Sequence, residues 1–246
     1  MKFEILKYKI YKIFFTVAFT LLFSNILAQS GGPPMMTDDP GVVDLHKWEI
    51  NLSVNTSFSD GLNEFEIPFV DINYGFFKNM HLKIEFPYTF YYTKNKKVTS
   101  SLGDATFGLK WKILDENKYF ISVGTYPQFT FYRERGFLLP LLLEKSFGNF
   151  VIGEDFGAFF EKNNNCMLHS STLISYKFSN RFDAESECHI EKDVKTNSAP
   201  DCYINFGCRY SLGEHIGLMA SFGRQILAKT QESEHFFSVA GVQLRF

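Results

Sequence analysis

The sequence lacks the motifs by which many enzymes and cofactor-binding proteins are recognised. It contains no P-loop, no H-E-x-x-H helix, no nucleophile elbow and no dinucleotide-binding fingerprint. Its four cysteines, Cys166, Cys188, Cys202 and Cys208, show no C-x-x-C spacing, which argues against a zinc or redox site. We therefore expect a protein that is not an enzyme, with no catalytic residue, no bound metal and no cofactor.

An excess of positive charge is also missing. The formal net charge is −2, and without its first 28 residues the chain has 21 Lys and Arg against 26 Asp and Glu. A chain with this negative balance is poorly suited to bind nucleic acid. We expect no nucleic-acid partner.

Long apolar runs are absent beyond the first 28 residues, and the run inside them is short. Four lysines precede an apolar stretch over residues 13–27, and Ala28 supplies the small residue of a cleavage site. This order predicts a secretory signal peptide over residues 1–28. The alternative is an uncleaved anchor helix, against which the missing stop-transfer segment argues.

The next segment, residues 29–45, reads QSGGPPMMTDDPGVVDL. Its glycines, three prolines and three aspartates exclude a regular strand or helix. We expect a periplasmic leader or a plug in a barrel mouth, with Asp38 and Asp39 as the plug candidates that pair with basic residues. Disorder of this segment is the alternative.

What the rest of the chain has is alternation. In residues 46–58 the positions of Trp48, Ile50, Leu52 and Val54 share one parity, and polar residues occupy the other. Strand side chains point to opposite faces with a period of two, so such a strand has one apolar and one polar face. Twelve stretches of this kind predict strands at 46–58, 64–75, 80–92, 102–113, 119–131, 138–147, 150–160, 167–178, 182–191, 201–212, 216–225 and 235–246.

This series predicts an all-β fold, a transmembrane antiparallel up-and-down β-barrel of about 12 strands over residues 46–246, in the bacterial outer membrane. The strands reach or approach the 9–11 residues needed to cross the hydrocarbon. Short and long connections alternate, which predicts that the short turns face the periplasm, and an even number of strands places both chain termini on that same side. A soluble β-sandwich would instead bury the apolar faces.

Parity also sorts the charges onto the inward face, because a Lys or Arg facing lipid at mid-membrane costs about 2–4 kcal/mol. Groups two residues apart on one strand are about 6.6 Å apart, which is too wide for adjacent ligands of one metal ion. We therefore expect the acidic row 183–191 to pair with basic residues on neighbouring walls. The lumen-lining candidates are Lys47, Glu49, Lys83, Glu85, Asp104, Lys110, Lys112, Asp183, Glu185, Glu187, His189 and Arg209.

Some positions depart from simple alternation. The parity of the second strand slips near Pro68, which predicts a bulge there. Glu154 shares the parity of its apolar neighbours, so either the register shifts or the outward face is misassigned in that strand. Cys188, Cys202 and Cys208 share the parity of their apolar neighbours, so we expect them to face lipid as small apolar residues, with a disulfide between Cys188 and Cys202 across their hairpin as the alternative.

Several segments, in chain order, resemble a known family. They include TDD at 37–39, Y-G at 74–75, LGDATFGLKWKI at 102–113 and EKSFG at 144–148. The resemblance is to bacterial outer-membrane β-barrels of the phenol-degradation meta-pathway transporter family. It implies an outer-membrane barrel of about this size, and it implies no particular substrate.

The last predicted strand ends on Phe246. An aromatic residue there resembles the signal read by the outer-membrane barrel-assembly machinery, which we expect as a partner together with outer-membrane lipid.

Side chains fill the interior of an eight-stranded barrel, and a sixteen-stranded porin has an open channel. The interior of a twelve-stranded barrel is intermediate in size. We expect passive or gated passage of small-molecule solutes, apolar or aromatic compounds foremost. The alternative is a closed barrel with a structural or adhesive role. A third hypothesis is a lipid-modifying outer-membrane enzyme that uses His169 and Ser171, although alternation turns both side chains inward.

Overall fold

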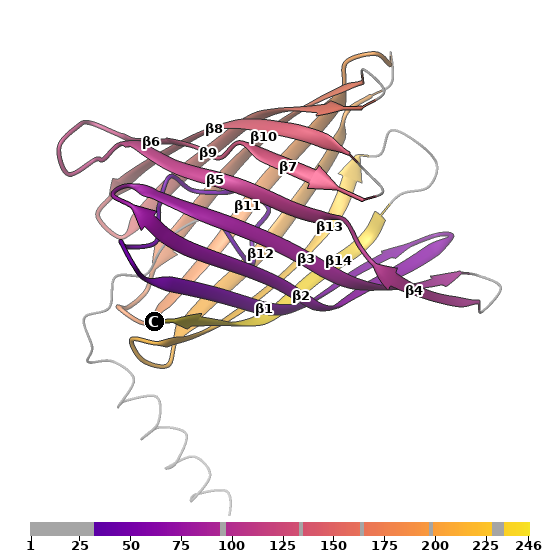
Figure 1. Ribbon diagram of the computed structural model, residues 1–246, viewed down its shortest axis with the longest axis horizontal. Helices are drawn as coiled ribbons and strands as arrows, with labels where there is room; N and C mark the ends of the chain where they lie inside the picture. Colours follow the sequence, from indigo (N-terminus) through magenta and orange to yellow (C-terminus); the bar gives the residue numbers. More distant parts are fainter. Residues whose placement is uncertain (1–31, 94–96, 133–134, 163–164, 197–198, 228–233) are drawn as a thin grey trace, which may run out of the picture.

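The computed structural model describes residues 32–93, 97–132, 135–162, 165–196, 199–227 and 234–246. The expected signal peptide lies outside the described residues. Within them, fourteen strand segments form one antiparallel sheet (Figure 1). The segments are β1 (Trp48–Ser59), β2 (Leu62–Phe77), β3 (Met80–Thr93), β4 (Val98–Leu102), β5 (Ala105–Leu114), β6 (Ser122–Thr125), β7 (Gln128–Phe131), β8 (Gly136–Phe147), β9 (Phe150–Glu161), β10 (Cys166–Lys177), β11 (Phe182–Asp193), β12 (Asp201–Ser211), β13 (Ile216–Leu227) and β14 (Glu234–Arg245).

The sheet closes on itself because β1 pairs with β2 on one side and with β14 on the other. Segments β4 and β5 both pair with β3, and β6 and β7 both lie between β5 and β8. Each of these two pairs takes the place of one strand. The fourteen segments therefore make a closed barrel of twelve strands, which confirms the predicted fold class.

Two of the expected strands are each divided into two segments in the structure. The strand expected at 102–113 breaks between Leu102 and Ala105, and the strand expected at 119–131 breaks at Tyr126 and Pro127. Pro127 has no amide hydrogen to donate to a ladder. In both breaks the backbone still bonds across the wall, with Gly103 N donating to Pro87 O at 3.0 Å and Leu109 N donating to Pro127 O at 3.1 Å.

The bulge predicted near Pro68 is confirmed. The pairing of β2 with β3 shifts between Glu66 and Phe69, and its pairing with β1 shifts opposite the same point, between Ser53 and Asn55. A proline cannot complete a ladder hydrogen bond, so the strand accommodates it by an extra residue. The bulge keeps Glu66 on the inner face of the wall, next to Asn55.

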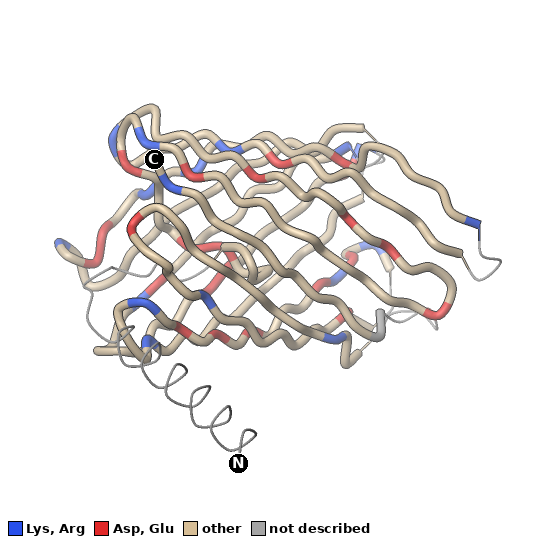
Figure 2. Tube along the Cα trace, turned by 90° about the horizontal axis from the view of Figure 1, so that it is seen from below, with Lys and Arg blue, Asp and Glu red and all other residues tan. Residues whose placement is uncertain are grey.

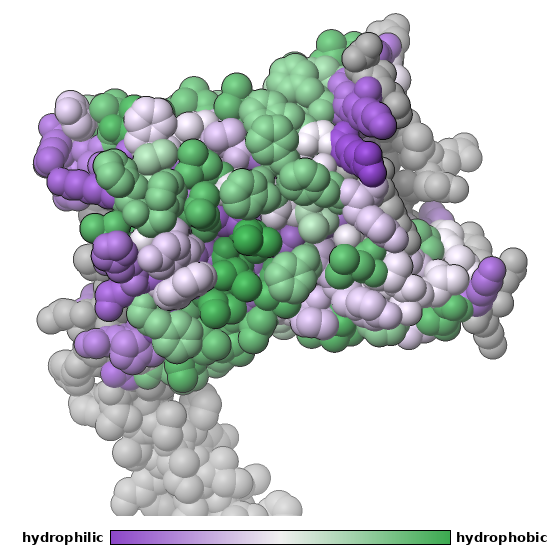
Figure 3. All heavy atoms as spheres, in the orientation of Figure 1, coloured by the Kyte–Doolittle hydropathy of each residue, from purple (hydrophilic) through white to green (hydrophobic). Residues whose placement is uncertain are grey.

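The barrel is apolar outside and polar inside, the reverse of a soluble β-sandwich. On the outer wall, Ile84 is 44% exposed and Phe206 is 61% exposed. On the inner wall, Lys110 is 4% exposed and Asp183 is 1% exposed. Figure 3 shows an apolar belt between two polar ends on the face in view. Outward apolar and inward polar positions are what a lipid environment favours.

Glu154 is an exception on the outer wall, and its register is regular. In the pairing of β9 with β10 it lies opposite Thr172, with Ile152 and Phe156 outward on either side. The Thr172 hydroxyl donates to its carboxylate at 2.9 Å. Both explanations suggested by the sequence are therefore wrong: neither a register shift nor a reversed face is present.

The short turns lie at one end of the barrel and include Gly148–Asn149 between β8 and β9. Phe246 lies at the same end, where its carbonyl accepts a hydrogen bond from Trp48 N at 3.1 Å. We call this the periplasmic end, because short turns face the periplasm in barrels of this kind. Figure 2 shows Lys and Arg concentrated toward it, whereas Asp and Glu occur along the length of the wall. Among the described residues, no helix is long and apolar enough to cross a membrane.

Candidate functional site

The described part of the leader, residues 32–45, lies inside the ring of strands over most of its length (Figure 1), whereas Asp44 and Leu45 are exposed. Met35 is 6% exposed, Thr37 is fully buried and Asp39 is 2% exposed. A polar segment can be buried only if its backbone groups find partners, since each unpaired group costs about 1–3 kcal/mol. The inner wall supplies those partners.

Glu187 on β11 is the first of them. Its carboxylate accepts hydrogen bonds from Met36 N at 2.8 Å, Thr37 N at 2.7 Å and the Thr37 hydroxyl at 2.7 Å. Asn205 on β12 also donates to it, at 2.8 Å. One carboxylate therefore satisfies two leader amides at once, and charge-assisted hydrogen bonds of this kind are stronger than neutral ones.

The acidic pair of the leader meets lysines of the opposite wall. Lys110 Nζ on β5 lies 2.5 Å from Asp38 Oδ1 and 3.3 Å from Asp39 Oδ1. Lys83 Nζ on β3 lies 3.9 Å from Asp38 Oδ2. These charges are almost fully removed from solvent, so each depends on the other for compensation.

Three further contacts tie the leader to the wall. Arg209 Nη2 donates to Gly32 O at 2.9 Å, Ser221 Oγ donates to Pro34 O at 2.9 Å, and Val43 N donates to His81 Nδ1 at 3.0 Å. The wall also leaves room for it. A Cβ on Gly207 would lie 2.5 Å from Met35 Sδ, and one on Gly75 would lie 2.0 Å from Asp44 O.

The other members of the acidic row on β11 have different surroundings. Glu185 lies 3.4 Å from the guanidinium of Arg209, and Asp183 is buried on the strand opposite the same arginine. His189 Nε2 lies 2.9 Å from Glu191 Oε1. Lys83 and Lys110 approach the leader and the carboxylates of their own wall instead of this row.

The remaining lumen-lining candidates lie nearer the rim. Glu49 is 9% exposed and lies 3.4 Å from Arg245, whereas Lys47 is exposed just before β1. Lys112 lies 3.4 Å from Asp115 at the periplasmic turn. Asp104 is half-buried in the break between β4 and β5.

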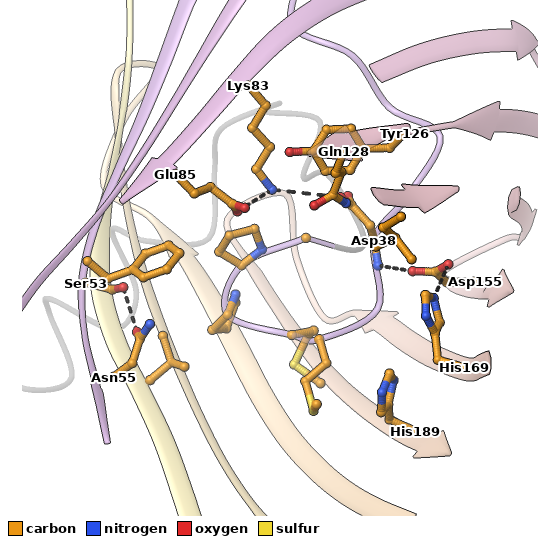
Figure 4. Close-up of a pocket in the computed structure, with 18 of the residues that line it drawn as sticks. Asp38, Ser53, Asn55, Lys83, Glu85, Tyr126, Gln128, Asp155, His169 and His189 are labelled. Carbon is orange, nitrogen blue, oxygen red and sulfur yellow. Dashed lines mark hydrogen bonds and ion pairs between the residues drawn. The ribbon is translucent and has the colours of Figure 1, made fainter. Parts of the chain in front are cut away.

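Above the leader lies a cavity of about 380 Å³ (Figure 4). Its apolar lining includes Met35, Met36, Phe69 and Leu138. Lys83 and Glu85 lie on one side in Figure 4, 2.9 Å apart, and polar groups of β9, β10 and β11 lie on the other. Those polar groups are Asp155, His169, His189 and Glu191.

His169 and Ser171 face the lumen but do not bond to each other. His169 Nε2 lies 3.0 Å from Asp155 Oδ1, while Ser171 Oγ lies 2.7 Å from His189 Nδ1. Ser171 is 1% exposed, and it does not line the cavity. A nucleophile must reach its substrate, and the Ser171 hydroxyl is the buried end of a hydrogen-bond chain whose other members, His189 and Glu191, line the cavity.

The cysteine thiols are free, and the sulfur atoms of Cys188 and Cys202 lie 3.9 Å apart. The two residues are diagonal neighbours, since Cys188 pairs with Ile204 and Cys202 pairs with Ile190.

Among the described residues, no three His, Cys, Asp or Glu side chains are placed to hold a metal ion.

Several inward residues were missing from the candidates chosen by sequence. Asn51 and Asp71 are buried on neighbouring strands, with Asn51 Nδ2 donating to Asp71 Oδ2 at 2.9 Å. Parity could have identified Asn51, because it alternates with Ile50 and Leu52. Tyr126, 1% exposed, lies in the break between β6 and β7, and it has the inward parity of Ser122 and Gln128.

No protein-family model matches the chain, and no curated protein sequence matches it. Solved structures do match. An outer-membrane channel from Pseudomonas putida F1 has a TM-score of 0.71 at 12% identity, covering 86% of this chain and 100% of that one. The KdgM porin has a TM-score of 0.55 at 13% identity, covering 80% and 99% of the two chains. The NanC porin has a TM-score of 0.57 at 11% identity, covering 78% and 98%.

At these identities the likeness shows the fold. The closed barrel, its apolar belt and its polar interior together define the class of protein: this chain is an outer-membrane β-barrel. The narrower family resemblance seen in the sequence is taken up below as part of a proposal.

Proposed function

We propose that this barrel allows small solutes, foremost apolar or aromatic ones, to cross the outer membrane, with the leader as a plug. One observation carries the proposal: a cavity of about 380 Å³ lies in the lumen directly above a leader that Asp38 and Lys110 hold in place. Met35, Met36 and Phe69 give this cavity an apolar surface. The sequence resemblance to the phenol-degradation meta-pathway transporter family supports passage of solutes, without indicating which ones.

The other parts of the proposal follow from the same arrangement. Residues 1–28 act as the signal peptide and 29–45 as the plug segment. The apolar belt contacts outer-membrane lipid, and Phe246 at the periplasmic rim serves as the signal for the assembly machinery. The inaccessibility of Ser171 supports transport over lipid hydrolysis.

A closed structural barrel is the second candidate, and a specific observation favours it. At the level of the leader the lumen is filled, with Asp71 fully buried and Asn51, Asp183 and Asn205 each 1% exposed. A lumen that stays filled passes no solute.

The test compares the mature chain with a variant that lacks residues 29–45. Both are reconstituted into planar bilayers for single-channel recording and into liposomes for swelling with solutes of graded size. We expect higher conductance and faster swelling for the deletion variant. Equal and negligible permeability of both proteins, each shown to be folded by heat-modifiable migration, would favour the structural barrel. A lipid-hydrolysis assay of the wild type and Ser171→Ala tests the enzyme hypothesis.

A further inference from the structure

Three acids beside the leader differ from the carboxylates on the long-loop side of the lumen in the groups that hold them. Beside the leader, Asp38 and Asp39 face Lys110, and Glu185 faces Arg209. Each of these acids lies next to a full positive charge. The negative charge of these three acids is therefore locally compensated, whereas Glu187 beside the leader is bound by two leader amides, the Thr37 hydroxyl and Asn205.

Farther from the periplasmic end, the carboxylates contact amides and imidazoles. Glu66 Oε2 accepts from Asn55 Nδ2 at 2.8 Å. Asp155 lies 3.0 Å from His169 Nε2, and Glu191 lies 2.9 Å from His189 Nε2. An amide or a neutral imidazole satisfies the hydrogen bond of a carboxylate without cancelling its charge.

The cavity has the same imbalance. Four carboxylates line it, those of Asp38, Glu85, Asp155 and Glu191. Among the described residues of its lining, Lys83 is the only Lys or Arg, and it lies 2.9 Å from Glu85. The cavity wall therefore carries more negative than positive charge.

A second feature of the wall suits a cation. Tyr126 is 1% exposed and lines the cavity, and its hydroxyl has no hydrogen-bond partner. Its ring already lies 5.1 Å from the ammonium of Lys83 (Figure 4). A phenol oxygen can accept from an ammonium group, and an aromatic face attracts a cation within about 6 Å.

We propose that this cavity is a cation-preferring vestibule, which admits neutral and positively charged small solutes and excludes anions. The inference rests on the proposed function and names its solute class. A cleft with one sign of charge and low-dielectric walls concentrates ions of the opposite sign. Rings of Asp and Glu select cations in channels by the same physics.

The test measures the potential of the cavity directly, whether or not the barrel conducts. All four native cysteines are replaced by serine, and a single cysteine is introduced at Gln128, which lines the cavity. Rates of modification are measured with a positively and a negatively charged methanethiosulfonate at pH 8, where an ordinary imidazole is neutral. The reference is a cysteine at Gly61, in the turn between β1 and β2, where nothing lies within 4 Å of a Cβ.

We expect the cation-to-anion rate ratio to be several-fold higher at position 128 than at position 61, and to fall in high salt. Glu66→Gln with Glu191→Gln keeps one acceptor oxygen on each side chain but removes two charges, so the ratio should drop toward the reference. Glu154→Gln removes one charge from the outer wall and should leave the ratio unchanged. Heat-modifiable migration checks that each variant folds.

Equal ratios at the two positions would overturn the proposal, as would a cysteine at position 128 that neither reagent modifies. If the Glu66→Gln, Glu191→Gln variant does not fold, the salt dependence of the rate ratio at position 128 is decisive, measured in the protein that keeps both glutamates. A barrel that conducts nothing but shows the expected ratio would refute the proposed transport function and leave the vestibule intact. A barrel that conducts but shows equal ratios at the two positions would refute the vestibule and leave the proposed transport function intact.

Discussion

The ammonium of Lys110 on β5 lies 2.5 Å from the carboxylate of Asp38 in the leader, with both side chains largely buried. Seventy-two residues separate them in the chain. This ion pair joins a segment without regular structure to the barrel wall. It is also the contact through which the plug can be tested most directly.

Replacing Lys110 by Gln should release the leader. It leaves Asp38 and Asp39 without their nearest cation, and breaking a buried pair on one side costs about 3–5 kcal/mol. We expect the leader to become sensitive to added protease and the single-channel conductance to rise. Adding Asp38→Asn with Asp39→Asn should restore much of the protection, because no buried charge is then left alone.

The control for this variant is Asp115→Asn, which breaks the exposed pair with Lys112 at a periplasmic turn. Exposed pairs contribute about 0–1 kcal/mol, so protease sensitivity should not change. A Lys110→Gln protein with a protected leader and unchanged conductance would show that the ion pair does not hold the plug.

Gly75 on β2 should not tolerate a side chain. A Cβ there would lie 2.0 Å from Asp44 O, and the carbonyl of Gly75 accepts a hydrogen bond from His46 N at 2.6 Å. Gly75→Ala should therefore displace the leader where it joins β1 and lower the midpoint of urea unfolding in detergent. Gly153→Ala on the inner wall of β9 is the matched control, since its nearest neighbour would lie at 3.6 Å. Equal unfolding midpoints for the two variants would contradict the prediction.

Glu116, in the periplasmic turn between β5 and β6, should make stability depend on pH. Partial burial raises its pKa, but hydrogen bonds from Ser146 and the charge of Lys145 lower it by more, so the pKa lies below its ordinary value. A group with a depressed pKa stabilises the fold above its unfolded pKa, and this contribution is lost as pH falls through the folded pKa.

We therefore expect Glu116→Gln to cost about 1 kcal/mol at neutral pH and progressively less as the solution is acidified. Urea unfolding of both proteins over a series of pH values measures this difference. Glu214→Gln, in the exposed turn between β12 and β13, serves as the control. A constant difference between wild type and Glu116→Gln at all pH values would disprove the linkage.

The outward carboxylate of Glu154 predicts that two substitutions affect the unfolding free energy differently. Thr172→Val removes the hydroxyl that donates to it at 2.9 Å, so the unfolding free energy in lipid vesicles should fall by about 1–3 kcal/mol. Glu154→Leu removes a polar group from the apolar belt, so the unfolding free energy should rise or stay unchanged. A loss of stability in Glu154→Leu as large as that in Thr172→Val would argue that this face of the barrel contacts something other than lipid.

The strands were predictable because alternation is local. Whether Ile50 or Asn51 faces lipid depends only on its parity within one strand, and the inside and outside of the barrel differ in polarity. The bulge at Pro68 was predictable for the same reason, since proline lacks an amide hydrogen. The interruption at Tyr126 was missed because alternation continues across it, with Val123 and Phe129 on the same parity. Near Gly103 the sequence does carry a signal, because the apolar positions change parity between Leu102 and Phe107.

The candidate site divides in the same way. Parity placed Lys83 and Glu185 among the inward residues, but it could not state which charges meet. Glu187 accepts from the leader 150 residues away, and His169 pairs with Asp155 instead of Ser171. Such partners depend on the register of neighbouring strands and on the path of a segment that has no period.

By itself the sequence determined the class of this protein, the number of strands and the medium that most strand side chains face, because those follow from a two-residue period and the cost of placing charge in lipid. Only the tertiary structure decided that the leader lies within the lumen, that Lys110 meets Asp38, and that a cavity remains above them. Closing the barrel brings distant strands together at one height, and no local pattern in the chain encodes that meeting.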